Sequence, residues 1–116
     1  MIGIDIVDVS RIEALRSRHG SHFLHRIFTE SEIGYAERKK RSAETLAGRF
    51  AAKEAFMKAF GRRLPWRDIE VLAGERGRPF ILFRGSRYEG VTISHEKAYA
   101  VAAVTLEQEK ASTGQG

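Results

Sequence analysis

One long apolar segment constrains the fold of this chain more than any other part of its sequence. Residues 42–60 are rich in alanine and aromatic side chains and are followed by Gly61, which suits the left-handed backbone of a helix C-cap. They predict the longest and most apolar helix of the chain. Glu54 lies four residues after Phe50 and three before Met57, so its carboxylate shares a face with side chains that are expected to be buried.

A carboxylate and an ammonium group on the same face of this helix indicate a functional site. Lys58 follows Glu54 by four residues and therefore lies on the same stripe. Burying charged side chains between a helix and its neighbours costs free energy unless another group compensates the charge. A bound metal ion together with an anionic ligand would do so.

The first residues predict a strand that carries an aspartate. Ile2, Ile4 and Ile6 define one face of it, which places Asp5 on the other face. Aspartate is depleted in strands, so Asp5 needs a specific role. Mg²⁺ prefers oxygen ligands and usually takes one or two protein carboxylates, with water and phosphate oxygens completing the shell. Asp5 and Glu54 are therefore candidate metal ligands. The alternative is that they form buried ion pairs with Arg49, Lys53 or Lys58.

Length and composition indicate one domain with an anionic partner. A chain of 116 residues suffices for a single core, and the absence of cysteine excludes disulfides, thiolate zinc sites and a cysteine nucleophile. The formal net charge of +5 favours an anionic partner without identifying it. No apolar run reaches the length of a membrane span and no leader precedes the first strand, so we expect a cytoplasmic protein with no membrane partner.

Two helices are expected between the first strand and the long apolar helix. Ser10 and Glu13 have the spacing of a capping box and predict a helix over about 10–26. Thr29 and Glu32 repeat that spacing and predict a second, shorter helix.

The second half of the chain is dominated by strand patterns. The expected fold is therefore α+β, with an N-terminal strand, three helices and a mostly antiparallel sheet in one domain over 1–106. Residues 107–116 are expected to form a polar, disordered tail. The predicted strands are 68–73, 80–83, 91–94 and 99–106, with breaks at 74–79 and 85–90.

Several motifs occur in a fixed order along residues 2–106. They are 3–8 with 11–13, 28–32, 46–50, 53–55 continuing to Phe60-Gly61, 77–80, and Ser94-His95 before an alanine-rich strand. Together they resemble the signature of the 4′-phosphopantetheinyl transferases, specifically the short holo-acyl-carrier-protein synthase type. The resemblance implies Mg²⁺-dependent transfer of 4′-phosphopantetheine from coenzyme A to a serine of apo acyl carrier protein, for fatty acid biosynthesis. The implied reaction releases adenosine 3′,5′-bisphosphate.

The resemblance also implies roles for individual residues. Asp5 and Glu54 would hold Mg²⁺, and Glu54 would accept the serine proton directly or through a metal-bound water. Lys58 would neutralise charge on the breaking bond. The acidic carrier protein would dock on Arg11, Arg18 and His22, which the sequence places along one stripe of the first helix. Coenzyme A would contact Arg49, Lys53, Lys58, Gly77, Arg78, Pro79 and His95.

Short members of the family are homotrimers with sites between subunits, so we expect Asp5, Glu54 and Lys58 of one subunit to face Gly77-Arg78-Pro79 and His95 of the next. Two features depart from the family. Arg78 stands where lysine is commoner, and 84–90 is short and polar where relatives often have a helical turn.

Three other interpretations are weaker. A Ser94–His95 catalytic pair is rejected because neighbours on a strand point to opposite faces. A basic nucleic-acid-binding module would show aromatic side chains interleaved with basic ones or a known binding motif, and neither is evident. A non-catalytic assembly subunit with this fold would be expected to lack Asp5 or Glu54, and the chain has both.

Overall fold

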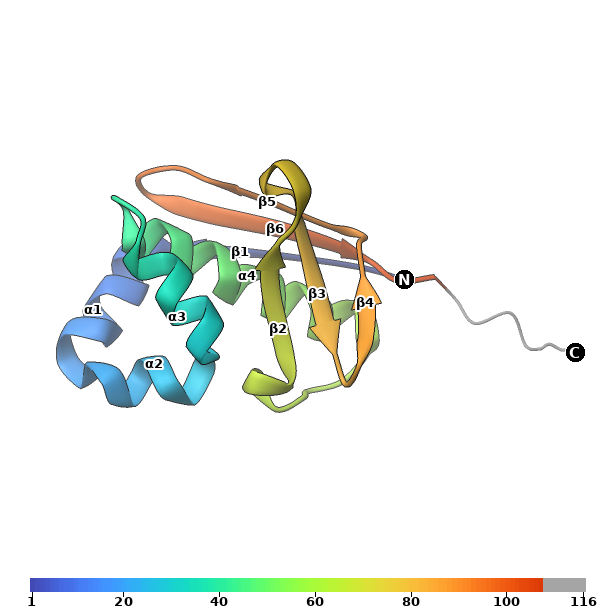
Figure 1. Ribbon diagram of the computed structural model, residues 1–116, viewed down its shortest axis with the longest axis horizontal. Coiled ribbons are helices and arrows are strands. Elements are labelled where there is room, and N and C mark those ends of the chain that lie inside the picture. The colour runs from blue at the N-terminus through green and yellow to red at the C-terminus, as the bar shows by residue number, and fades with distance from the viewer. Residues whose placement is uncertain (108–116) are drawn as a thin grey trace, which may run out of the picture.

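The computed structural model describes residues 1–107 and contains two three-stranded antiparallel sheets around one long helix (Figure 1). The first sheet has the order β1-β6-β5 and the second the order β2-β3-β4. The α+β class and the antiparallel pairing predicted from the sequence are confirmed. The helices are α1 (Val9–His19), α2 (Ser21–Ile27), α3 (Glu30–Glu37) and α4 (Ser42–Phe60), and the strands are β1 (Ile2–Asp8), β2 (Ile69–Ala73), β3 (Pro79–Phe83), β4 (Ser86–Tyr88), β5 (Val91–His95) and β6 (Tyr99–Thr105).

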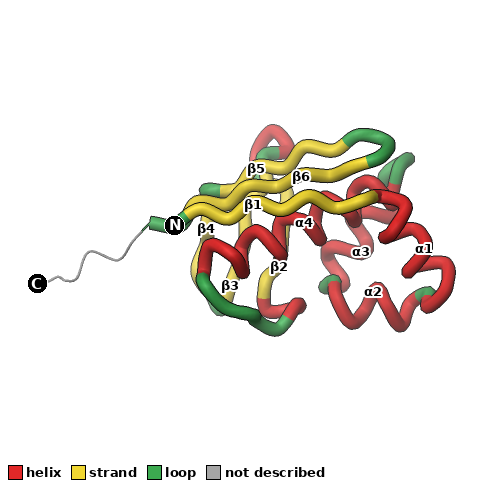
Figure 2. Tube along the Cα trace, turned by 180° about the vertical axis from the view of Figure 1, so that it is seen from behind, coloured by secondary structure: helices red, strands yellow, loops and turns green. Residues whose placement is uncertain are grey.

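Helix α4 forms the centre of the molecule, as its apolar sequence predicts. It packs against all three strands of the first sheet and also contacts α1, α3 and β2 (Figure 2). Nearly all of its side chains are buried, so it has no broad solvent-facing side. It ends at Gly61 in the left-handed conformation, with the backbone N–H donating to the Met57 carbonyl.

Two glycines allow the first sheet to lie directly on α4. A Cβ at Gly3 on β1 would lie 1.9 Å from the Ala55 carbonyl oxygen, and one at Gly48 on α4 would lie 2.9 Å from Cγ2 of Ile93 on β5. No side chain fits at Gly3 without displacing backbone atoms. This close approach brings the inner face of β1 against the middle of α4.

The predicted first helix over 10–26 is wrong in its length and its cap. Gly20 breaks it at φ 56° into α1 and α2, because that conformation is readily adopted by glycine but not by other residues. The N-cap is Asp8, whose carboxylate accepts a hydrogen bond from the Ser10 backbone N–H, so Ser10 and Glu13 do not form the predicted capping box. The predicted capping box of Thr29 and Glu32 is confirmed at the start of α3.

The predicted strands are confirmed within one or two residues, with one addition. Residues 85–90, predicted as a break, contain β4, which pairs with β3. A two-residue turn joins them, formed by Arg84 and Gly85 with φ of 49° and 86°. Two positive φ values in succession are typical of tight hairpin turns. Short 3₁₀ turns at Trp66–Asp68 and Glu75–Gly77 precede β2 and β3.

The outer face of the first sheet is apolar and exposed. Ile2, Ile4 and Ile6 are 68%, 59% and 63% exposed, and on the neighbouring strand β6 Tyr99 and Val101 are also exposed. The register places Ile6 opposite Val101 in the same row of the sheet. The predicted division of β1 into an isoleucine face and a face with Asp5 is thus confirmed, with Asp5 on the side of α4.

Within residues 1–107 no helix is long and apolar enough to cross a membrane. Of the predicted polar tail, only Glu107 belongs to the described residues; 108–116 lie outside them.

Candidate active site

The carboxylate of Asp5 lies between β1 and α4 and is paired with Lys58. Lys58 Nζ donates to Asp5 Oδ1 at 3.0 Å and to the Ile4 carbonyl oxygen at 3.0 Å. The lysine is exposed, whereas Asp5 is partly buried. The strand and the helix thus bring together two of the residues that the sequence assigned to the site.

The charges of three neighbouring side chains act on the Asp5 carboxyl. Burial raises the pKa of the Asp5 carboxyl above its usual value, and the hydrogen bond and positive charge of Lys58 oppose that shift. The negative charge of Glu54 raises the pKa further, and the positive charge of Arg11 lowers it. Glu54 and Arg11 therefore lie close enough to Asp5 for their charges to act on it.

Glu54 is paired with an arginine that the sequence analysis did not consider. Arg63 Nη1 lies 2.9 Å from Glu54 Oε1, and the Arg63 guanidinium also lies over the Trp66 ring at 5.3 Å from its centroid. The only signal in the sequence is the Arg62-Arg63 pair directly after Gly61. Whether either arginine reaches Glu54 depends on how the chain turns back beside α4 after Gly61.

The donor set fits Mg²⁺ with oxygen ligands from a substrate. Among the described residues, no group of three or more histidine, cysteine or acidic side chains could hold a metal ion by itself. Mg²⁺ does not need such a group, because one or two carboxylates suffice when phosphate oxygens and water complete the shell. Asp5 and Glu54 match that requirement, and each is a carboxylate that already attracts a cationic group of the chain.

Lys53, expected to contact coenzyme A phosphates, lies instead in the core. Its Nζ lies 2.7 Å from Glu32 Oε1 and also donates to the backbone carbonyls of Ile27 and Trp66. Both side chains of the ion pair are 0% exposed. Lys53 has no free surface and no free proton with which to bind a ligand, so its predicted role is replaced by a structural one.

Arg49 is buried against the ring of Tyr35. The guanidinium carbon lies 4.3 Å from the ring centroid, and Nε has no hydrogen-bond partner within residues 1–107. Burial lowers the pKa of the guanidinium from its usual value. Arg49 lines a pocket of about 290 Å³ together with Tyr35, Arg38 and Phe80. Its predicted contact with phosphate stays a prediction.

His95 lies at the end of β5 and is held by a carboxylate from α4. Its Nδ1 lies 2.9 Å from Glu44 Oε1, and Glu44 also accepts a hydrogen bond from Arg41. The hydrogen bond from His95 is the main reason that the pKa of Glu44 lies below its usual value. Glu44 was not singled out in the sequence, because its partner is 51 residues away.

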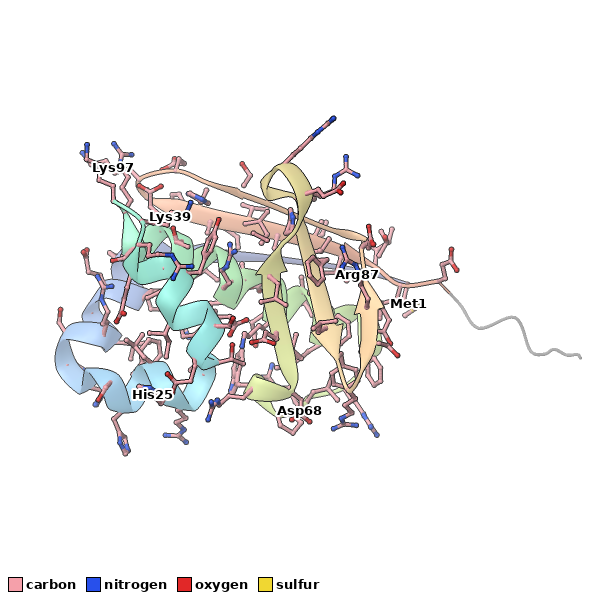
Figure 3. All side chains as sticks on the ribbon, viewed as in Figure 1. Met1, His25, Lys39, Asp68, Arg87 and Lys97 are labelled. Atoms are coloured by element: carbon pink, nitrogen blue, oxygen red, sulfur yellow. The ribbon has the colours of Figure 1, made fainter. Side chains whose placement is uncertain are left out.

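The turn with Gly77, Arg78 and Pro79 borders a separate groove of about 1310 Å³. Arg87 of β4, which Figure 3 labels, lines this groove. Its guanidinium lies 3.7 Å from the Phe80 ring centroid. Gly77 has a φ of 74° and so needs the freedom of glycine. The groove is lined by Arg76, Arg78, Pro79, Phe80, Arg87 and Glu89, with further residues of β5 and β6.

The site residues form two groups that do not meet within one chain. Glu54 and Lys58 belong to the second half of α4, with Asp5 of β1 beside them, whereas His95 is bound to Glu44 near the start of the helix. Glu44 and Glu54 are ten residues apart, which is roughly 15 Å along a helix axis. No hydrogen bond or ion pair among the described residues joins either group to Arg78.

The basic residues predicted to dock a carrier protein are exposed, but they do not share one helix. Arg11 and Arg18 belong to α1, whereas His22 lies in α2 beyond the break at Gly20. The predicted single stripe is therefore wrong. Arg11 lies over the Phe50 ring at 5.7 Å from the centroid, near the Asp5 group.

Comparison with known proteins places these features in a family. Residues 1–104 match the family model described as the 4′-phosphopantetheinyl transferase superfamily. A holo-[acyl-carrier-protein] synthase of Halothermothrix orenii is 39% identical, over 92% of this chain and 96% of its own length. The corresponding enzyme of Bacillus mycoides is 45% identical, over 91% and 93%.

Solved structures agree with the sequence matches. The holo-[acyl-carrier-protein] synthase of Helicobacter pylori in complex with coenzyme A has a TM-score of 0.83 at 31% identity and covers 92% of this chain and 100% of its own. That of Bacillus anthracis, also in complex with CoA (3′,5′-ADP), has a TM-score of 0.77 at 40% identity, covering 89% and 91%.

Proposed function

Because this chain belongs to the 4′-phosphopantetheinyl transferase superfamily, we propose that it transfers 4′-phosphopantetheine from coenzyme A to a serine of apo acyl carrier protein. The products are holo acyl carrier protein and adenosine 3′,5′-bisphosphate. The observation that carries the proposal is the pair of carboxylates, Asp5 on β1 and Glu54 on α4, each beside a cationic side chain at one surface of the molecule.

The reaction is a phosphoryl transfer in which the protein mainly positions groups and stabilises charge. The serine oxygen forms a bond to the phosphorus that carries pantetheine, and the bond from that phosphorus to the oxygen bridging to the nucleotide phosphate breaks. Glu54 accepts the serine proton. Lys58 is exposed beside Asp5 and stabilises the negative charge that grows on the leaving bisphosphate. Asp5 and Glu54 would hold Mg²⁺, which would supply further positive charge near the phosphates of coenzyme A.

Basic residues at a distance from Asp5 and Glu54 would bind the nucleotide end of coenzyme A. Glu44 holds Nδ1 of His95, and the ring protonated on both nitrogens would donate its Nε2–H to a phosphate oxygen. Arg49 and Arg78 are two further candidates for phosphate contact, since a guanidinium can donate two parallel hydrogen bonds.

The activity can be tested by the mass of an apo carrier protein incubated with this protein, coenzyme A and Mg²⁺, with and without EDTA. We expect a mass gain of one phosphopantetheine that EDTA abolishes. Glu54→Gln keeps size and removes charge, and should lower the rate by about 100-fold or more. Glu37→Gln, an equivalent change at an exposed position of α3, serves as the control. Normal turnover by Glu54→Gln at limiting Mg²⁺ would refute the assignment.

The exposed apolar face of the first sheet supports the predicted homotrimer. Ile2, Ile4 and Ile6 on one face of β1 form an exposed apolar patch with Tyr99 and Val101 of β6. Monomeric proteins rarely expose large apolar patches to water. In such an assembly Asp5, Glu54 and Lys58 of one subunit would face the Gly77-Arg78-Pro79 turn and His95 of another. This arrangement explains why the two groups are separate within one chain.

The acidic carrier protein is proposed to dock on α1. Arg18→Glu is the sharper test, because the charge of Arg11 also acts on Asp5. We expect the apparent KM for carrier protein to rise about tenfold and its salt dependence to flatten, with the apparent KM for coenzyme A unchanged. Equal losses for both substrates would contradict docking at this helix. Cytoplasmic location and a role in fatty acid biosynthesis stay predictions.

A further inference from the structure

Arg63 forms an ion pair with Glu54, the carboxylate that the proposed reaction requires as a metal ligand. It lies in the short connection between α4 and β2, where the chain turns at Gly61 with a φ of 94° and returns beside the helix. The guanidinium donates to Glu54 Oε1 at 2.9 Å. The Glu54 side chain is only 21% exposed, so little of it is left for another cation while Arg63 is bound.

The two ion pairs of the site differ in how firmly the cation is held. Lys58 donates both to Asp5 and to the Ile4 backbone carbonyl, whereas Arg63 has Glu54 as its single hydrogen-bond acceptor among the described residues. Arg63 is also 68% exposed. Exposed ion pairs of this kind contribute little free energy and exchange readily with solvent.

The connection does not depend on the Glu54 pair for its shape. Gly61 caps α4 through the Met57 carbonyl, and Trp66 packs on Phe50 with ring centroids 5.0 Å apart. Arg63 can therefore leave Glu54 while the backbone on either side stays in place.

We propose that Arg63 acts as an internal competitor of the divalent cation: it pairs with Glu54 in the ligand-free protein and must release it before the cation binds. The inference rests on the proposed function, because it takes Asp5 and Glu54 as the metal ligands. Its consequence is that the free protein binds Mg²⁺ or Mn²⁺ more weakly than its two carboxylates alone would.

The test is a titration of the ligand-free protein with Mn²⁺, in which free Mn²⁺ is measured by electron paramagnetic resonance without coenzyme A or carrier protein. Arg63→Gln should lower the Kd for Mn²⁺ about fivefold, the factor expected for removing a competing exposed ion pair. The matched control is Arg62→Gln, which removes the same charge from the adjacent residue. Arg62 lies over the Phe60 ring and makes no ion pair with Glu54, so its Kd should change less than about twofold.

The outcomes separate this inference from the metal assignment. Glu54→Gln and Asp5→Asn should each weaken Mn²⁺ binding, and if neither does, the metal site and the role of Arg63 both fail. If they weaken it but Arg63→Gln leaves the Kd unchanged or raises it, only the competitor role is overturned. Equal tightening by Arg62→Gln would also overturn it, since the effect would then be one of overall charge. Circular dichroism of each variant confirms that the fold is retained.

Discussion

Two aspartates of β1, Asp5 in the middle of the strand and Asp8 at its end, illustrate how local surroundings decide what a carboxylate does. Burial raises the pKa of Asp5, so the folded protein binds its proton more tightly than the unfolded chain does. The contribution of Asp5 to stability is thus fully present below the ordinary pKa of 3.8 and is lost as pH rises through the raised value. We expect Asp5→Asn to have a Tm at pH 7 equal to or above that of the wild type, although it loses activity. The difference should shrink as pH falls toward 4.

Asp8 supplies a control, because its pKa is shifted in the opposite direction from that of Asp5. Its hydrogen bonds from the Ser10 side chain and backbone hold its pKa below 3.8, so its contribution is present above that pH and is lost as pH falls through the lowered value. Asp8→Ala should therefore lower the Tm at pH 7, and its deficit should shrink in acid. Thermal unfolding from about pH 2 to 8 measures both, because the change at Asp8 falls below pH 3.8. A Tm for Asp5→Asn well below wild type at pH 7 would contradict the assigned cost of burying Asp5.

At the scale of elements, the buried Lys53–Glu32 pair joins α4 to α3, β2 and the end of α2. Glu32 caps α3, accepts from the Val71 backbone N–H at 2.6 Å and pairs with Lys53. Removing one partner strands the other without a counter-charge, so Lys53→Met should destabilise the protein by about 3–5 kcal/mol in urea unfolding. Both side chains are 0% exposed, so water cannot compensate the charge that is left.

The double variant Lys53→Met with Glu32→Gln shows whether the pair acts as a unit. We expect its cost to be smaller than the sum of the two single costs by more than about 1 kcal/mol, since neither charge is then left unpaired. All variants must be compared at one protein concentration, because assembly adds to apparent stability. Costs that add within about 0.5 kcal/mol would show that the two side chains act independently.

At the scale of the whole molecule, the isoleucine face of the first sheet should determine assembly. We expect the wild type to sediment as three 13.1 kDa chains. Ile4→Asp places a charge in the middle of the proposed interface and should yield monomers, because a buried unpaired charge costs several kcal/mol. Ser86→Asp introduces the same charge on exposed β4 of the other sheet and should stay trimeric. A wild type that sediments as a monomer at micromolar concentration would reject the trimer.

Much of the framework follows from the sequence because it depends on local rules. The alternation of β1 placed Asp5 on the face opposite the isoleucines, the Thr29–Glu32 spacing gave a capping box, and Gly61 ended α4. Each of these depends on residues within four positions of one another. Gly20 lay inside a helical pattern and was missed as a break, because glycine is tolerated in helices and only its φ of 56° reveals the end of α1.

What the tertiary structure alone decided is which charged side chain of α4 faces inward. Periodicity assigns a helix face to the core only when one side is polar, and α4 is enclosed on almost every side. Lys53 and Glu54 are neighbours, yet Lys53 reaches Glu32 in the core while Glu54 meets Arg63 at the surface. These partners lie 21 and 9 residues away along the chain. Their meeting depends on how α3 and the connection after Gly61 pack on α4, which no local pattern contains.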